Sequence, residues 1–237
     1  MYIPMLPASV ASWWANIQKE FYDNLISGDR YKMIFRGLGV TLEVALISSL
    51  LGALLGCLVA LMRLSKNKVL RGISGVYVDV IRGTPLLVQL LIIYHVILSS
   101  VTNQVLIAII AFSINSGAYV SEVVRGGILA VDKGQTEAGR SLGLSAVSTM
   151  LLIVMPQAIK VIIPSLFNEF IALLKETSIV GYIGLMDLTK AGDFIRSRTF
   201  SAFFPYITVA LIYLAIVTTL SRLFGIVERR LRQGDLR

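Results

Sequence analysis

The sequence of 237 residues has very few of the side chains that enzymes and metal sites use. It contains one cysteine, Cys57, and one histidine, His95. A single cysteine excludes an internal disulfide and a cysteine-based metal site, and a single histidine excludes a histidine cluster. No Ser-His-Asp or paired-carboxylate arrangement stands out, and no G-x-x-x-x-G-K-S/T phosphate-binding loop occurs. We therefore expect no cofactor on this chain, no ATP binding and no hydrolysis.

Charged residues are also scarce. They make up 15% of the chain, whereas a soluble domain carries about 25%. Hydrophobic residues account for 56% and the mean hydropathy is +0.78, which indicates an integral membrane protein. The net charge of +8 comes from basic residues scattered between apolar runs. That pattern argues against nucleic-acid binding and suits loops beside anionic lipids.

Long apolar runs are what the sequence has instead. A membrane span needs about 20 apolar residues, and five stretches qualify: 37–62, 74–98, 104–130, 145–174 and 203–227. We predict an all-α membrane protein with a transmembrane domain over 37–227. An N-terminal extracytoplasmic or interfacial segment, 1–36, precedes it, and a basic tail, 228–237, follows. Within the first segment, residues 10–25 are expected to form an amphipathic helix with its aromatic side chains at the membrane interface.

The distribution of basic residues predicts the orientation. The loop after the first span, the loop around Lys133 and the tail fall on one side and hold 12 of the 22 Lys and Arg. By the positive-inside rule that side is cytoplasmic. No cleavable signal peptide is evident in the first residues. We therefore expect the N-terminus outside and the C-terminus inside.

A short polar stretch, EAGRSLG, separates the third and fourth spans on the cytoplasmic side. Glu137 and Arg140 are three residues apart, so they are neighbours if the stretch is helical, and Gly134 and Gly143 mark its ends. One interpretation is a surface helix that transmits force from a soluble partner into the membrane. The other is a solvated loop with an incidental salt bridge.

The spacing in this stretch resembles the signature loop of ATP-binding-cassette (ABC) importer permeases. That signature is EAA, three residues, G, nine residues and I-x-L-P, and here it is EAG-RSL-G-LSAVSTMLL-I-V-M-P. Gly139 replaces the third alanine and Met155 replaces the leucine. The stretches VDVIRGTPLLVQLLIIY, GAYVSEVVRGGILAVDKGQTEAGRSLGLS and NEFIALLKETSIVGYIGLMDL resemble the polar amino-acid branch of the same family.

The resemblance implies the type I ABC importer permease fold, with a coupling helix at about 134–143. The residues expected to couple this helix to the ATPase are Glu137, Ala138, Gly139 and Gly143. It also implies a bacterial cell-membrane location and a second permease subunit, identical or homologous. Cytoplasmic ATPase subunits would hold the ATP and Mg. An extracytoplasmic solute-binding protein or domain would deliver the amino acid.

Charged and amide side chains inside the spans are the candidates for the substrate pathway, because such groups usually face protein or water. Glu169 and Asn168 follow Pro164, whose ring disturbs the helix and frees a carbonyl. We interpret Glu169 as the acceptor of the substrate's cationic group. The alternative is a buried ion pair with Lys160 or Lys175.

Asn115, Tyr119 and Glu122 form one stripe of the third span. We assign Asn115 and Tyr119, with Gln89 of the second span, to the pathway, although helix–helix hydrogen bonding is an alternative. Glu122 is expected to pack and to pair with Arg125. Other expected ion pairs join Asp79 to Arg82, and Glu43 to Arg36 or Arg82.

Two other functions are compatible with these residues. An ion-gradient-driven secondary amino-acid carrier would use the same carboxylates as ion ligands, but the five spans have no obvious internal repeat. A scaffold or sensor subunit would need no pathway at all, so changing Glu169 would affect only stability.

Overall fold

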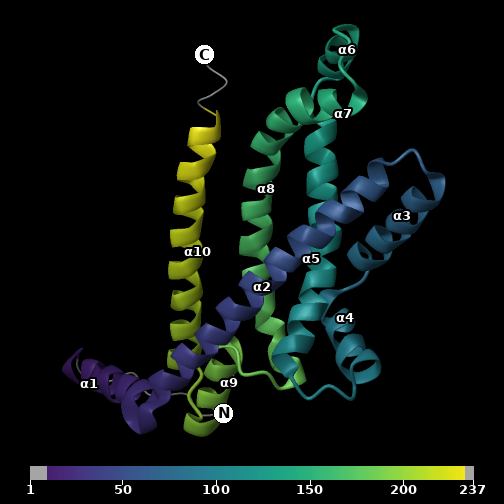
Figure 1. Ribbon diagram of the computed structural model, residues 1–237. Coiled ribbons are helices and arrows are strands. Elements are labelled where there is room, and N and C mark those ends of the chain that lie inside the picture. Colours follow the sequence, from purple (N-terminus) through teal and green to yellow (C-terminus); the bar gives the residue numbers. More distant parts are fainter. Residues whose placement is uncertain (1–9, 233–237) are drawn as a thin grey trace.

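The computed structural model describes residues 10–232, so the first nine residues of the N-terminal segment and the last five of the tail lie outside it. Within this part of the chain all regular elements are helices (Figure 1). The α-helices are α1 Val10–Phe21, α2 Arg30–Leu64, α3 Lys68–Arg82, α4 Leu86–Ile92, α5 Gln104–Leu129, α6 Lys133–Ser141, α7 Ala146–Thr149, α8 Met155–Glu176, α9 Leu188–Thr199 and α10 Phe203–Arg232. Short 3₁₀ or π segments are η1 Tyr22–Ile26, η2 Ser27–Asp29, η3 Ile93–Ile97, η4 Met150–Val154 and η5 Thr177–Ile183.

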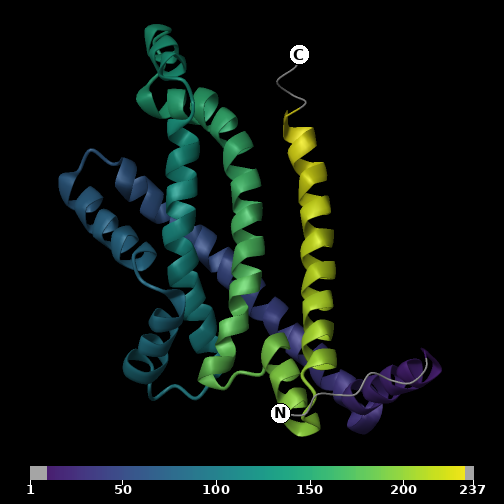
Figure 2. The same ribbon diagram turned by 180° about the vertical axis from the view of Figure 1, so that it is seen from behind.

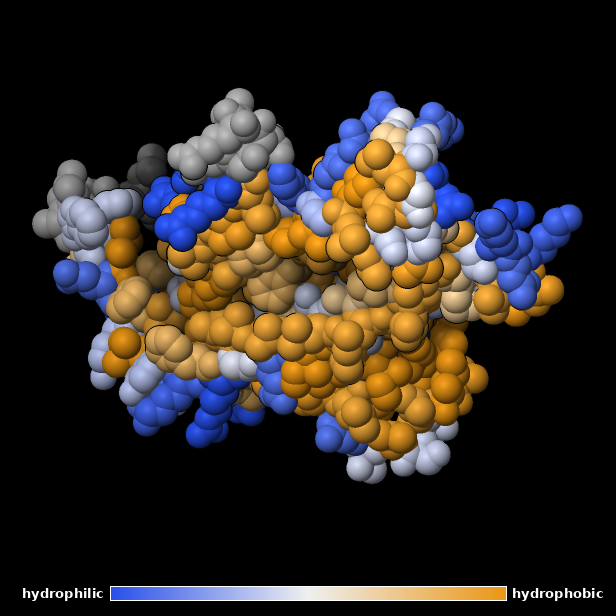
Figure 3. Space-filling view, turned by 45° about the horizontal axis from the view of Figure 1, so that its top comes forward, coloured by the Kyte–Doolittle hydropathy of each residue, from blue (hydrophilic) through white to orange (hydrophobic). Residues whose placement is uncertain are grey.

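Four of the five predicted spans are long apolar helical segments. They contain α2, α5, α8 and α10, and each is long and apolar enough to cross a membrane. Hydrophobic side chains cover the broad middle of the molecule in Figure 3, and hydrophilic ones lie around its edges. Several leucines of α2 are exposed, including Leu50, Leu54 and Leu58. The amphipathic N-terminal helix is present as α1, with Trp13 and Trp14 exposed.

The second span departs from the prediction of a continuous helix. It is broken between α3 and α4, and the two parts meet at 105°. Pro85 disfavours a helical conformation of Thr84, the residue before it. Helix α3 ends at Arg82, and the Gly83 N–H that follows donates to Asp79 O at 2.9 Å. The five-span architecture therefore holds if the bent pair counts as one span.

Helices α2 and α5 pack closely against each other because small residues lie at their contact. A Cβ atom added at Gly52 would lie 2.7 Å from Ser116 Cβ, and one added at Gly56 would lie 2.6 Å from Val120 Cβ. The glycines are four residues apart, on one face of α2, which lets the helix backbones approach as in many membrane proteins.

Helix α9 is held against α2 at the end of the molecule opposite α6 (Figures 1 and 2). The Leu188 N–H donates to Thr41 Oγ1 at 3.1 Å, and a Cβ added at Gly37 would lie 2.5 Å from Asp187 O. Asp187 caps α9, since its carboxylate accepts from the N–H groups of Thr189 and Lys190, both at 2.9 Å. These bonds fix the side chains of the first turns of α9.

Candidate functional site

The polar stretch between the third and fourth spans forms α6, which protrudes at one end of the molecule (Figure 1). Asp132 caps its start, with Gly134 N–H donating to Asp132 Oδ1 at 2.6 Å. Gly143, at φ +82°, ends it in the left-handed conformation that favours glycine. The stretch is therefore helical over Lys133–Ser141, and a coupling role for this helix stays a prediction.

Helix α6 exposes Glu137 and Ala138 and buries Gly139. The expected neighbour pair of Glu137 and Arg140 forms no ion pair; Arg140 Nη1 instead donates to Leu144 O at 2.6 Å, across the end of the helix. Glu137 is thus an unengaged carboxylate at the protruding end, accessible to a soluble partner.

Gly139 lies where α6 packs against α7 and η4, which lead into α8. A Cβ atom there would lie 2.8 Å from both Thr149 Cγ2 and Ile153 Cδ1. A second link joins Gln157 Nε2 to Gln135 Oε1 at 3.3 Å. Because η4 continues into α8, packed side chains join α6 to α8 in addition to the chain itself.

Glu169 lies on α8, about 21 Å along the helix from its first residue at a rise of about 1.5 Å per residue. Among residues 10–232 it is the only charged side chain that lines a cavity of about 260 Å³. The other lining residues come from four helices and are Leu46, Ser49, Leu50, Ala53, Val120, Leu166, Phe167, Phe170 and Phe224. Phe167 and Phe224 stack there at 4.0 Å between ring centroids.

The carboxylate of Glu169 forms no hydrogen bond or ion pair with the residues that the structure describes, so the alternative of a buried pair with Lys160 or Lys175 is wrong. A lone carboxylate among apolar and aromatic walls is suited to accept a cationic group from a ligand. Its part in substrate binding stays a prediction.

Gln89 and Asn115 are brought together, and they join α4 to α5. Asn115 Nδ2 donates to Gln89 Oε1 at 3.0 Å. Gln89 Nε2 in turn donates to Ile81 O at 2.7 Å and to Thr84 O at 3.0 Å, beside the break between α3 and α4. The Gln89 amide thus satisfies backbone carbonyls that the broken helix leaves without partners, and Asn115 binds the other end of that amide. A contact with substrate stays a prediction for these two residues.

Tyr119 and Glu122 lie beside an arginine cluster at the junction of α2, α3 and α5. The Glu122 carboxylate is 2.7 Å from Arg125 Nη2, which confirms the expected pair, and 2.5 Å from Arg63 Nη1. Arg82 is 3.9 Å from Glu122 and stacks over the Tyr119 ring at 5.2 Å. Glu122 therefore fastens three helices together, and Tyr119 is partly exposed next to them.

Two expected ion pairs are wrong. Arg82 pairs with Glu122 and not with Asp79, which is exposed on α3. Glu43 is exposed on α2 and pairs with neither Arg36 nor Arg82. A contact between α3 and α5 determines where Arg82 points, and spacing along one helix does not contain that information.

Asn168 and Glu43 occupy exposed positions of spanning helices. Asn168 does not line the Glu169 cavity, and its pathway role stays a prediction. Glu43 was not among the pathway candidates. It lies one turn before Leu46, which lines the cavity, so the two share a face of α2. Glu43 itself does not line that cavity.

Comparison with known proteins places this architecture in a family. The family described as "Binding-protein-dependent transport system inner membrane component" matches residues 32–233. The putative glutamine transport system permease protein GlnP of Rickettsia bellii is 44% identical over 201 residues, which are 84% of this chain and 92% of that protein. The L-cystine transport system permease protein TcyB of Bacillus subtilis is 38% identical over 232 residues, 97% of this chain and 95% of that protein.

A solved structure has the same fold. It is described as the crystal structure of an amino acid ABC transporter with histidines, and it matches with a TM-score of 0.81 and 40% identity over 95% of this chain and 100% of that one. The chain belongs to the family of inner-membrane components of binding-protein-dependent transport systems. Its fold is that of a type I ABC importer permease.

Proposed function

We propose that this chain is the membrane-spanning permease subunit of an ABC importer for polar amino acids. The relatives named above are described as permeases for glutamine and for L-cystine, which share an α-ammonium and an α-carboxylate group. The observation that carries the proposal is the packed connection from α6, through Gly139 and η4, to the helix that bears Glu169.

The proposed mechanism uses two sites on this chain. ATPase subunits, which hold ATP and Mg, dock on α6 around Glu137. Nucleotide binds the closed ATPase pair better than the open pair, and this difference in affinity shifts the permease between its outward- and inward-open states. Glu169 accepts the cationic group of the amino acid, with Asn168, Asn115, Tyr119 and Gln89 along the same pathway.

The proposed assembly contains two copies of this chain, or one copy and a homologous permease, in the bacterial cell membrane. A solute-binding protein or domain delivers substrate from outside, where the N-terminus and α9 lie, and α6 and the C-terminus face the cytoplasm. Nothing in the comparisons supports the ion-gradient carrier that the sequence left open.

A charge reversal on α6 tests the docking role. Glu137→Lys, in an exposed position, is expected to abolish co-purification of the ATPase while the permease still reaches the membrane. Glu20→Lys makes the same charge change on α1, at the opposite end, and is expected to leave the ATPase bound. Full ATPase yield with Glu137→Lys would overturn the proposed coupling site.

A further inference from the structure

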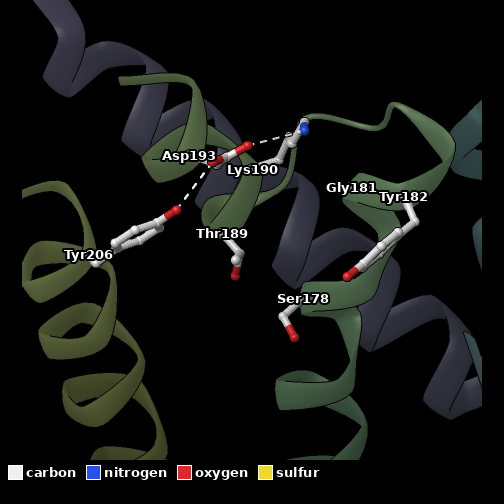
Figure 4. Close-up of a pocket in the computed structure, with 7 residues that line it drawn as sticks. All are labelled: Ser178, Gly181, Tyr182, Thr189, Lys190, Asp193 and Tyr206. Atoms are coloured by element: carbon white, nitrogen blue, oxygen red, sulfur yellow. Dashed lines mark hydrogen bonds and ion pairs between the residues drawn. The ribbon is translucent and has the colours of Figure 1, made fainter. Parts of the chain in front are cut away.

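A second cavity lies at the end of the molecule opposite α6 (Figure 4). Its volume is about 370 Å³, and it opens between η5, α9 and α10. This volume falls within the range of small-molecule sites, which is about 300–1,000 Å³. Polar side chains dominate its lining: Ser178, Tyr182, Thr189, Lys190, Asp193 and Tyr206. In this respect it is the opposite of the Glu169 cavity.

One positive and one negative group lie side by side in this second cavity. Lys190 Nζ is 3.3 Å from Asp193 Oδ2. The other carboxylate oxygen, Oδ1, accepts from Arg196 Nη2 at 2.8 Å and from the Tyr206 hydroxyl at 3.2 Å. Oδ1 is therefore fully engaged, whereas Oδ2 has one long contact and the ammonium group has two unused donors.

The position of the lysine is fixed by close packing. Its stem lies against η5 at Gly181, where an added Cβ atom would be 3.2 Å from Lys190 Cδ. Its backbone N–H is bound by the Asp187 cap. Lys190 thus lines the cavity with its stem packed against Gly181 and its backbone held by Asp187.

Two hydroxyl groups of the lining have no partner. The side chains of Ser178 and Tyr182 form no hydrogen bond with residues 10–232. In Figure 4 Tyr182 lies across the cavity from Tyr206, with Ser178 between them. These hydroxyls can donate to a carboxylate, and the tyrosine rings supply apolar walls.

We propose that this cavity is a second amino-acid site, which binds the zwitterionic α-amino and α-carboxyl groups together. The two charges of an α-amino acid sit on substituents of one carbon atom, so they match a lysine and an aspartate held next to each other. The substrate carboxylate pairs with Lys190 Nζ and the free hydroxyls, and its ammonium pairs with Asp193 Oδ2. The site rests on the proposed function, and it receives substrate at the outer end before Glu169 does.

The two sites differ in what they require of a ligand. The Glu169 cavity offers one carboxylate and selects a cation, so arginine methyl ester fits it. The outer cavity needs both charges, so neither arginine methyl ester nor N-acetylarginine binds there. The difference allows the two sites to be separated by experiment.

The test uses the intact complex in lipid nanodiscs without its binding protein, with radiolabelled L-glutamine and L-arginine as probes. The Glu169→Gln complex is expected to retain one class of binding site that arginine methyl ester does not block. Adding Lys190→Met is expected to weaken that remaining binding at least about tenfold, because an ionic hydrogen bond is lost. Arg198→Met removes an exposed cation of α9 outside the cavity and is expected to leave it unchanged.

Tyr182→Phe is the second variant, because it removes one unbonded hydroxyl from a side chain that is 69% exposed. Tyr182→Phe is expected to weaken the remaining binding about threefold or more without lowering the melting temperature. If the Lys190→Met complex does not assemble, this variant alone tests the outer site. Binding that neither variant changes, or its absence from the Glu169→Gln complex while the wild type imports amino acids with ATP, would overturn the outer site alone. A wild type that holds no ATPase and imports nothing would overturn the proposed function instead.

Discussion

Glu169 and Glu122 are both carboxylates of spanning helices, and their surroundings give them different tasks. Glu122 is within 4 Å of three arginines, and these ion pairs hold α2, α3 and α5 together. Glu169 faces a cavity of aromatic and aliphatic side chains without a bonded partner. Glu169 is partly buried, and withdrawing a charge from water without a partner is costly, which is the physical reason to expect a ligand's cation beside it.

Glu169→Gln tests this expectation. The amide keeps the shape of the side chain but loses the charge, so amino-acid stimulation of ATPase activity should need about ten- to hundredfold more substrate. Asp79→Asn removes an exposed carboxylate from α3 and should change neither that concentration nor the yield of the complex. An unchanged substrate dependence in Glu169→Gln would remove Glu169 from the pathway and favour a scaffold subunit.

Asp193 makes the outer end sensitive to acid. The Arg196 guanidinium hydrogen-bonded to Asp193 holds the pKa of that carboxyl below its ordinary value of 3.8. Since the folded-state pKa lies below the unfolded one, the stabilisation is present above about pH 4 and is lost as the pH falls further. The melting temperatures of wild type and Asp193→Asn should therefore converge on acidification. A difference that stays constant with pH would show that this carboxylate does not titrate as expected.

At the scale of the elements, small residues allow helices α2 and α5 to approach closely. Gly56→Ala would place a Cβ 2.6 Å from Val120 Cβ and 2.9 Å from Gly117 O, and the backbone oxygen cannot rotate away. Overpacking of this kind costs about 1–3 kcal/mol, so the melting temperature in detergent should fall. Gly39→Ala on the same helix meets no atom within 4 Å and should be neutral or slightly stabilising. Equal melting temperatures for the two variants would contradict the close contact.

Apolar length is a local property of the sequence, and it predicted the segments that contain α2, α5, α8 and α10, whereas α9 was not predicted. Gly134 and Gly143 were the sequence signals for the ends of α6; the structure caps its start with Asp132 and places Gly143 just beyond its end. The break at Pro85 also had a local signal, but the Gln89 hydrogen bonds to Ile81 O and Thr84 O across the 105° bend are contacts that the sequence did not predict. The division of the chain at residues 36 and 227 stays a prediction.

The candidate site was predictable only in part, because its contacts join distant segments. Gln89 and Asn115 could be selected as polar residues in spans, but their mutual bond crosses two helices. The outer cavity combines η5, α9 and α10, and no regular spacing connects Ser178, Lys190 and Tyr206. Arg82 was assigned to Asp79 on spacing, and tertiary packing brings it to Glu122 instead.

At the scale of the whole molecule, the proposed orientation is open to a direct test. Helix α6 and the end of α10 lie at one end, and α1 and α9 lie at the other (Figures 1 and 2). A protease-cleavable tag at the C-terminus should be cut in inside-out vesicles and protected in intact spheroplasts. Cleavage in spheroplasts would reverse the topology and would place the outer cavity in the cytoplasm.

The central claim is that amino-acid movement through this chain is driven by an ATPase docked on α6. The most direct measurement is uptake of labelled glutamine and arginine by liposomes that contain the purified complex and its binding protein. The account predicts uptake that requires ATP and disappears with Glu137→Lys. Uptake by the chain alone, driven by an ion gradient without any ATPase, would contradict it.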